Sequence, residues 1–175
     1  MNPLQAGNVA LRPPEYSDKF RLAELCNNKK IWDNVRDSIP FPYTISDAEY
    51  FIGLCRDENP PMTFIIEYHN EVAGVIGLVK QTDVYRLTAE IGYWVGEPFW
   101  GKKIATTAVK LITGYGFDKL MLVRIFTGVF EHNIASQRVL TKAGFKLEGI
   151  FENSVVKNGE VIDEYRYALI NPLFI

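Results

Sequence analysis

The sequence predicts an α/β fold with one mixed, mostly antiparallel sheet of about seven strands and helices on both faces. Runs rich in β-branched and aromatic residues alternate with runs whose apolar residues recur every three to four positions. Turn signals such as Asn158-Gly159 separate neighbouring β-rich runs. Hydrophobic residues make up 47% and charged residues 23% of the 175-residue chain, as in globular proteins with a substantial core. We therefore expect one domain over residues 1–175.

The first part of the chain is mainly helical. A short strand over residues 8–12 precedes a helix for which Ser17 or Asp18 is the expected N-cap. An extended aromatic loop over residues 39–43 follows, because residues before proline avoid helical geometry. Ser46–Glu49 matches a capping box and predicts the start of a second helix.

The rest of the chain alternates between strands and helices. We expect strands over residues 62–68, 72–79, 88–95, 122–129, 145–154 and 161–171. Two helices lie between them, one from near Lys103 to near Phe117 and one from Asn133, as N-cap, to Ala143. Three consecutive antiparallel strands, then helix, strand, helix and a closing strand pair give a mixed sheet.

Composition excludes several classes of protein. The net charge of −2 argues against a non-specific nucleic-acid binder, and no apolar window is long enough to span a membrane. The N-terminal residues lack the pattern of a signal peptide. Cys26 and Cys55 lack metal-ligand spacing and are expected to be buried free thiols, and His69 and His132 are isolated, so we expect no metal site. These features favour a cytoplasmic protein.

The chain is organised around residues 90–109, which read as a strand, a turn-rich loop and the start of a helix. The first backbone N–H groups of a helix have no partner within the helix, and the helix dipole favours negative charge there. This order of elements is typical of an anion site. We expect the loop to hold the pyrophosphate of a nucleotide-bearing cofactor.

Four stretches carry a resemblance to a known family: Val9–Pro13, Glu90–Val109, Asn133–Phe145 and Asn158–Asp163. Together they resemble the GNAT superfamily of acetyl-CoA-dependent N-acetyltransferases, especially the branch of ribosomal-protein N-terminal acetyltransferases and spermidine acetyltransferases. The resemblance implies a GNAT-like acyl-CoA N-acyltransferase fold and acetyl-CoA as co-substrate. It implies direct attack by a primary amine in a ternary complex, the amine being a protein N-terminus or a small molecule. The alternative is a non-catalytic acyl-CoA-binding or regulatory domain, and a monomer and a homodimer are both compatible with the sequence.

The resemblance assigns the cofactor to two parts of the chain. The residues are Trp94, Val95, Trp100, Gly101, Lys102, Lys103, Ile104, Ala105, Thr106, Asn133, Ser136 and Arg138. Lys103 stands where the family usually has glycine, which matters only if the backbone there needs a positive φ. We expect a helical φ, with the lysine charge near phosphate oxygens. Asn133 is either an N-cap or a pantetheine ligand, and Arg138 lies either near a phosphate or on a solvated helix face.

Acetyl transfer to an amine needs a proton acceptor, a donor that polarises the thioester carbonyl and a proton source for the thiolate. Glu90 is the candidate base, although it could instead be a cross-strand partner of a cation. The family places the polarising backbone N–H at Val95 or its neighbour. Leu140 stands where many relatives have a tyrosine acid, and Ser136, one turn earlier, is the candidate in its place.

The acceptor side is predicted from residue type and position. Trp32, Phe41 and Tyr43 lie in the segment where this family builds one wall of its acceptor groove, although core packing explains them equally well. Asp163, near the last strand, could attract a cationic amine or be an ordinary surface charge.

Overall fold

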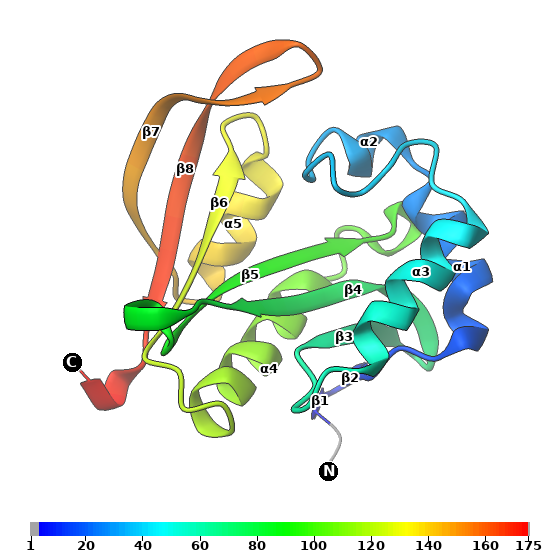
Figure 1. Cartoon of the computed structure of the whole chain (residues 1–175), viewed down its shortest axis with the longest axis horizontal. Coiled ribbons are helices and arrows are strands. Elements are labelled where there is room, and N and C mark those ends of the chain that lie inside the picture. Colours follow the sequence, from blue (N-terminus) through cyan, green and yellow to red (C-terminus); the bar gives the residue numbers. More distant parts are fainter. Residues whose placement is uncertain (1–3, 175) are drawn as a thin grey trace. The chain divides into compact units, whose positions relative to one another are not determined.

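A computed structural model describes residues 4–174 of the chain. Figure 1 shows the strands of one mixed sheet, with the hydrogen-bonded order β1-β2-β3-β4-β5-β6-β8-β7. The predicted α/β class is therefore confirmed. The strands are β1 (Leu4–Ala6), β2 (Val9–Arg12), β3 (Thr63–Tyr68), β4 (Glu71–Lys80), β5 (Thr88–Val95), β6 (Arg124–Phe130), β7 (Lys146–Lys157) and β8 (Glu160–Ile170).

The α-helices among the described residues are α1 (Lys19–Cys26), α2 (Lys29–Trp32), α3 (Ile45–Arg56), α4 (Ile104–Asp118) and α5 (Ile134–Lys142). A short 3₁₀ helix, η3 (Glu97–Phe99), joins β5 to the loop before α4. The chain divides into two compact units, Met1–Gly77 with Tyr93–Ile112 and Leu78–Gly92 with Thr113–Ile175. We call these the first and second units; β4, β5 and α4 each contribute to both.

Two expectations about the first unit are corrected. The described strands number eight rather than about seven, because Leu4–Ala6 pairs with β2 in a hairpin around Gly7, whose φ is +58°. The capping box of α3 uses Thr44 and Asp47 instead of Ser46 and Glu49. The Thr44 hydroxyl accepts from the Asp47 N–H, and the Asp47 carboxylate accepts from the Thr44 N–H at 2.8 Å, so the N-cap lies two residues earlier than the sequence pattern indicates.

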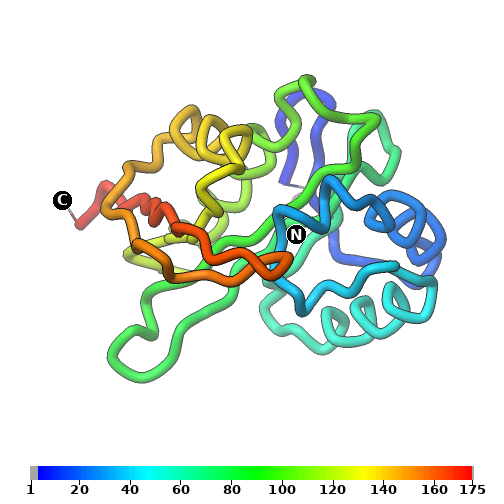
Figure 2. The backbone as a smooth tube through the Cα atoms, turned by 90° about the horizontal axis from the view of Figure 1, so that it is seen from above, coloured from blue at the N-terminus to red at the C-terminus, as the bar shows by residue number. Residues whose placement is uncertain are grey.

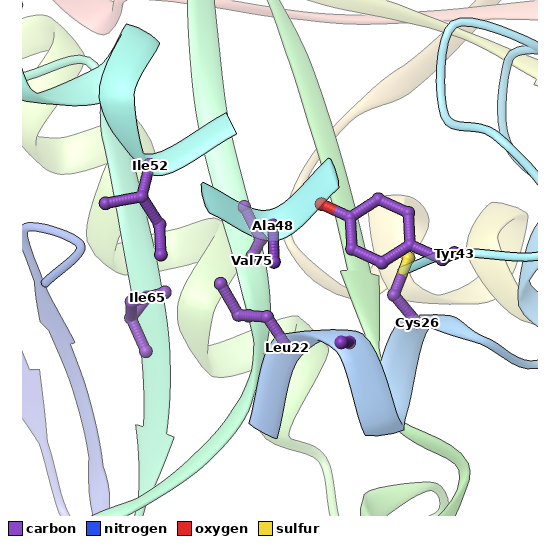
Figure 3. Close-up of a cluster of buried hydrophobic side chains, with 8 residues drawn as sticks. Leu22, Cys26, Tyr43, Ala48, Ile52, Ile65 and Val75 are labelled. Carbon is purple, nitrogen blue, oxygen red and sulfur yellow. The ribbon is translucent and has the colours of Figure 1, made fainter. Parts of the chain in front are cut away.

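Helices α1 and α3 pack on one face of β3 and β4. Figure 3 shows their shared core, to which Leu22 and Ile52 contribute from the helices and Ile65 and Val75 from the strands. The alternate strand residue Phe64 is also buried, so both faces of these strands are covered. The turn between β3 and β4 is His69-Asn70, both with positive φ, which is the expected hairpin geometry.

Arg12 connects β2 to the start of α1. Its guanidinium donates two hydrogen bonds to the Asp18 carboxylate, at 2.7 and 2.8 Å, and one to Glu67 of β3 at 2.7 Å. Burial of Asp18 raises its pKa, but the hydrogen bonds from Arg12 and from the Glu15 N–H outweigh this and lower the pKa overall. Asp18 is thus the residue before α1, as expected, with its side chain engaged by Arg12 rather than by the helix.

The second unit is built on β6, β8 and β7. β6 pairs in parallel with the first residues of β5, from Thr88 to Glu90, and antiparallel with β8. Figure 2 shows β7 and β8 running side by side, with a turn at Asn158-Gly159 where both φ angles are positive, as predicted. Two register irregularities interrupt this pair, the second around Asn153. Helix α5 packs against β8, where the Tyr167 hydroxyl lies 3.5 Å from Gln137 Oε1.

Cys26 and Cys55 are free, buried thiols, as the sequence indicates. Burial raises the pKa of Cys26 to about 12 and that of Cys55 to about 11, so neither is a ready nucleophile. Among the helices of the described residues, none has the length and apolar character required to cross a membrane.

Candidate active site

The end of β5 approaches β4 closely. The Trp94 carbonyl oxygen lies 2.2 Å from the point that a Cβ atom on Gly74 would occupy, so only glycine fits opposite this carbonyl. The carbonyl therefore points toward β4. Because the peptide bond is planar and trans, the N–H of Val95 points the other way, away from Gly74. One of the backbone donors predicted for the thioester carbonyl thus has a defined direction.

The next peptide is held on both sides. The Val95 carbonyl accepts a hydrogen bond from the Trp100 indole at 2.6 Å, and the Gly96 N–H donates to the Ala73 carbonyl at 2.8 Å. The Gly96 N–H is therefore already used within the protein. Of the two amides that the sequence left open, Val95 is the better-placed donor.

The backbone of the loop after η3 turns sharply. Gly101 has a φ of +75° and Lys103 a φ of +62°. The expectation of a helical φ at Lys103 is wrong: the position has the left-handed geometry that glycine adopts easily, and a lysine there is strained by about 1 kcal/mol. The strain is tolerated because Lys103 precedes the helix, and its carbonyl accepts the Thr107 N–H at 3.1 Å as the first hydrogen bond of α4.

The backbone N–H groups of this loop make no hydrogen bonds within the described residues. Within residues 4–174, the six N–H groups from Gly101 to Thr106 have no protein acceptor. The left-handed residues alternate with Lys102 before the N-terminus of α4, which is the backbone pattern of an anion-binding nest. Ile104 and Ala108, which are buried at 1% and 0% exposure, anchor the helix below the loop. The residues present fit a pyrophosphate group.

The two lysines of the loop differ in their surroundings. Lys102 Nζ lies 5.5 Å from the ring centre of Phe99 and 5.8 Å from that of Tyr68, so aromatic faces hold its charge. Lys103 is exposed and has no ion pair or ring contact among the described residues. Lys103 is therefore the lysine whose charge is available to an anion in the loop.

Glu97 connects the cofactor loop to α2. Its carboxylate accepts hydrogen bonds from Asn28, at 2.7 Å, and from Lys30. Hydrogen bonds from Lys30 and then Asn28 lower the pKa of Glu97. Asn28 also caps α2, since its Oδ1 accepts the Lys30 N–H at 2.9 Å. The helix that carries Trp32 is thus tied to the segment between β5 and the loop.

The three aromatic residues predicted for the acceptor wall have different surroundings. The Trp32 indole donates to the Ile39 carbonyl at 3.0 Å, and the Trp32 and Phe41 rings lie 5.6 Å apart, with Phe41 41% exposed. Tyr43 is only 9% exposed and lies beside Cys26 in the core cluster of Figure 3. Its burial favours the core-packing alternative, whereas Trp32 and Phe41 form a partly exposed aromatic pair.

In the second unit, Asn133 is the N-cap of α5, as predicted. Its Oδ1 accepts the Ser136 N–H at 3.1 Å, which leaves the amide nitrogen of the side chain able to donate elsewhere. Ser136 is half-buried on the first turn, and Leu140, one turn later, is fully buried. Arg138 is exposed, and no ion pair of the described residues involves it, in agreement with a solvated helix face.

The carboxylate predicted as the base, Glu90, and the one predicted to bind the acceptor, Asp163, also lie in this unit. Glu90 is half-buried opposite Phe126 of β6, while its neighbours Ala89 and Ile91 are buried on the other face of β5. Asp163 Oδ1 accepts the Asn153 N–H at 2.8 Å and so supports the irregularity in β7. The Asp163 carboxylate therefore has a structural partner in addition to any acceptor.

Trp94 differs from the other residues assigned to the cofactor. Its side chain packs against the core cluster of α1 and α3, so its backbone, not its ring, lies at the strand end. Sequence reasoning missed two residues of this region, Gly74 and Glu97. A glycine inside a β-rich run is a signal of close backbone approach and could have identified Gly74. Glu97 had no comparable signal, because its partners lie 67 and 69 residues away.

The described residues contain no group of three or more His, Cys, Asp or Glu side chains arranged as a metal site would require. The candidate groups for acetyl transfer are instead the backbone N–H groups at the end of β5 and in the loop, the Glu90 carboxylate and the Ser136 hydroxyl.

Comparison with known proteins identifies the family. Residues 8–146 match the family model described as an acetyltransferase (GNAT) domain. The chain is 37% identical over 125 residues to the probable N-acetyltransferase YjcK of Bacillus subtilis, covering 71% of this chain and 69% of that protein. It is 29% identical over 164 residues to the spermidine N(1)-acetyltransferase of Escherichia coli K12, covering 94% and 84% of the two chains.

A solved structure agrees in fold. The microcin C7 self-immunity acetyltransferase MccE, determined in complex with acetyl-CoA and AMP, superposes with a TM-score of 0.80 at 28% identity and covers 95% of this chain and 94% of its own. The resemblance predicted from the sequence is confirmed, as is acetyl-CoA as the co-substrate. The protein belongs to the GNAT family of acetyl-CoA-dependent N-acetyltransferases.

Proposed function

We propose that this enzyme transfers the acetyl group of acetyl-CoA to a primary amine by direct attack in a ternary complex. The row of six N–H groups from Gly101 to Thr106 carries the proposal, because it fits a pyrophosphate at the start of a helix. Acetyl-CoA supplies the acyl group in an activated thioester. The enzyme's own contribution is to hold the two substrates in line and to stabilise charge as it develops.

The Val95 N–H is the proposed donor to the developing oxyanion. Its direction follows from the packing of the Trp94 carbonyl against Gly74, and the following peptide is fixed by Trp100 and Ala73. A donor held in place before the reaction needs no reorganisation during it, which is the basis of electrostatic stabilisation.

Glu90 is the proposed proton acceptor, directly or through water, because an amine must be neutral to attack. In Glu90→Gln we expect kcat/KM to fall about 100-fold, within the usual range for the loss of a general base, and the shape of the pH–rate profile to change. Glu160→Gln, at the exposed start of β8, is the control with the same chemical change. An unaltered pH–rate profile in Glu90→Gln would remove Glu90 as the base.

Ser136 is the proposed donor to the leaving thiolate. It lies half-buried on the first turn of α5, and Leu140 supplies no hydroxyl one turn later. We expect Ser136→Ala to lower kcat with little change in KM for acetyl-CoA. If turnover by Ser136→Ala equals that of the wild type, water is the proton source.

The acceptor is tested with a panel of primary amines that includes polyamines, amino sugars and peptides with free N-termini. Thermal-shift titration first establishes binding: acetyl-CoA at about 100 times its dissociation constant stabilises by about 2.7 kcal/mol. CoA release is then followed with a thiol reagent, to which the buried Cys26 and Cys55 contribute little background. A thermal shift without CoA release for any amine would contradict the proposed reaction and favour a non-catalytic acyl-CoA-binding domain.

A further inference from the structure

One side chain joins the end of β5 to the anion-binding loop. Trp100 lies immediately before Gly101, and its indole N–H donates to the carbonyl of Val95, the last residue of β5, at 2.6 Å. This is a short, part-buried hydrogen bond between a side chain and the backbone. Its acceptor belongs to the residue whose N–H is proposed to polarise the substrate carbonyl.

The segment from Val95 to Trp100, which the indole bond closes, also has backbone hydrogen bonds of its own. Within it, the Phe99 N–H donates to the Gly96 carbonyl at 2.9 Å, and the Trp100 N–H donates to the Glu97 carbonyl at 3.2 Å. The indole bond therefore closes a compact turn that includes η3. This turn links the residue before Gly101 directly to the Val95 carbonyl.

Three contacts together fix the backbone of Val95. The preceding peptide is held by the Trp94 carbonyl against Gly74, and the following peptide is held by the Trp100 indole on one side and Ala73 on the other. With both peptide planes fixed, φ and ψ of Val95 are fixed as well. Removing the indole donor frees the second plane on the side facing the loop, and the Val95 carbonyl, in a residue only 8% exposed, loses its partner.

We propose that Trp100 is a positioning residue for acetyl transfer: its indole N–H orients the Val95 backbone and couples that orientation to the occupied anion-binding loop. The proposal rests on the proposed function. It differs from the assignment of Trp100 as a cofactor contact, because it places the effect on the rate of the chemical step rather than on cofactor affinity.

Two substitutions separate the hydrogen bond from the bulk of the ring. Trp100→Phe keeps an aromatic ring and removes the donor. Trp100→His removes the larger ring and keeps a donor, since Nε2 of histidine occupies the same place in its five-membered ring as Nε1 of tryptophan. A packing role, or a stacking role toward the cofactor, predicts that Phe preserves activity better than His. The positioning role predicts the opposite order.

The experiment measures kcat, KM and the dissociation constant for acetyl-CoA, with an amine that the wild-type enzyme accepts. At pH about 8, where histidine is neutral, we expect kcat of Trp100→Phe to fall about tenfold, as for the loss of one hydrogen bond, and kcat of Trp100→His to stay within about threefold of wild type. The dissociation constant for acetyl-CoA should change less than kcat in both. Full kcat in Trp100→Phe, or a lower kcat in Trp100→His than in Trp100→Phe, would overturn the proposal.

A second measurement needs no acceptor. The chain has three tryptophans, so its ¹⁵N–¹H spectrum contains three indole signals that single substitutions assign. We expect the Trp100 indole proton to exchange with solvent more slowly than that of free tryptophan, although Trp100 is 45% exposed. Exchange as fast as in free tryptophan would contradict the hydrogen bond itself. A wild-type protein that binds acetyl-CoA without turnover contradicts the proposed function, whereas an active wild type with an unaffected Trp100→Phe contradicts only the role of Trp100.

Discussion

Lys103 offers the most direct test of the backbone geometry at the anion-binding loop. It is a lysine with a φ of +62°, next to Gly101, where the chain does have glycine for its φ of +75°. The residue therefore has two separable effects, a conformational cost from its backbone and a charge at the start of α4. Three variants distinguish them: Lys103→Ala removes the charge, Lys103→Gly removes the charge and the conformational cost, and Lys103→Asn removes the charge and introduces a residue that tolerates this geometry.

The magnitudes follow from the two effects. A non-glycine residue with left-handed geometry costs about 1 kcal/mol in the folded state. Glycine removes this cost but makes the unfolded chain more flexible, which offsets roughly half of the gain in stability. We therefore expect Lys103→Gly to be more stable than Lys103→Ala by about 0.5 kcal/mol, with Lys103→Asn between them. For a chain of this size the difference corresponds to roughly 1–2 °C in Tm. All three variants lose the lysine charge, so all three should bind acetyl-CoA several-fold more weakly than the wild type.

Denaturant unfolding and acetyl-CoA titration of the wild type and the three variants provide the assay. The lysine charge is unfavourable beside the positive end of the helix dipole until an anion binds and attracts it. Because salt screens this attraction, the loss of affinity caused by the substitutions should shrink at high salt. Lys102→Ala is the matched control, because Lys102 lies against Phe99 and Tyr68 and its φ is not positive. Equal stability of Lys103→Ala and Lys103→Gly would refute the left-handed geometry in solution, and unchanged affinity would refute the role of the charge.

Three further predictions concern the surroundings of the site. Gly74→Ala should destabilise the protein by about 2 kcal/mol or more, because its Cβ would lie 2.2 Å from the Trp94 carbonyl oxygen. Gly92→Ala, with no neighbour within 4 Å, is the control and should be nearly neutral. Equal unfolding free energies of the two variants would show that the close approach is absent. Asp18→Asn should cost about 2 kcal/mol at pH 7. The deficit should begin to shrink at about pH 4, where an unfolded Asp carboxyl titrates, and should continue to shrink as the pH falls through the lowered pKa of folded Asp18; a deficit that does not change between pH 7 and the lowest pH at which the protein stays folded would contradict the Arg12 pair as its cause. Cys26 and Cys55 should react with a thiol reagent only as fast as the protein unfolds, and prompt reaction of the native protein would contradict their burial.

Sequence patterns predicted the elements that depend on local signals. The turn at Asn158-Gly159, the cap at Asn133 and the helix after the loop are all where periodicity and turn chemistry place them. The capping box of α3 was misplaced by two residues because Thr44-x-x-Asp47 and Ser46-x-x-Glu49 overlap and both fit the pattern. The φ of Lys103 could not be derived from the residue type, since lysine avoids positive φ and only the path of the loop imposes it.

The site residues likewise fall into two groups, those placed by the local sequence and those placed by contacts with residues distant in the sequence. The segment that carries the proposed anion site is contiguous in the sequence, so its strand, loop and helix start could be predicted from residues 90–109. The contacts that orient the strand end come from Gly74 and Ala73, and the contacts that tie Glu97 to α2 span almost seventy residues. Such contacts depend on which strands become neighbours, and a single sequence does not contain that information locally.

The stretches that carry the family resemblance serve folding more than acceptor recognition. Arg12 joins β2 to the start of α1, Asn133 caps α5, and Gly144 and Asn158 provide positive φ angles at turns. Two of the stretches also carry groups proposed to contact acetyl-CoA, the N–H groups from Gly101 to Thr106 and the Ser136 hydroxyl. Similarity in these stretches therefore transfers the fold and the cofactor site from relative to relative, and it leaves the acceptor free to differ. The partly exposed pair Trp32 and Phe41 lies outside these stretches, and we expect substitutions there to change acceptor preference while leaving acetyl-CoA affinity intact.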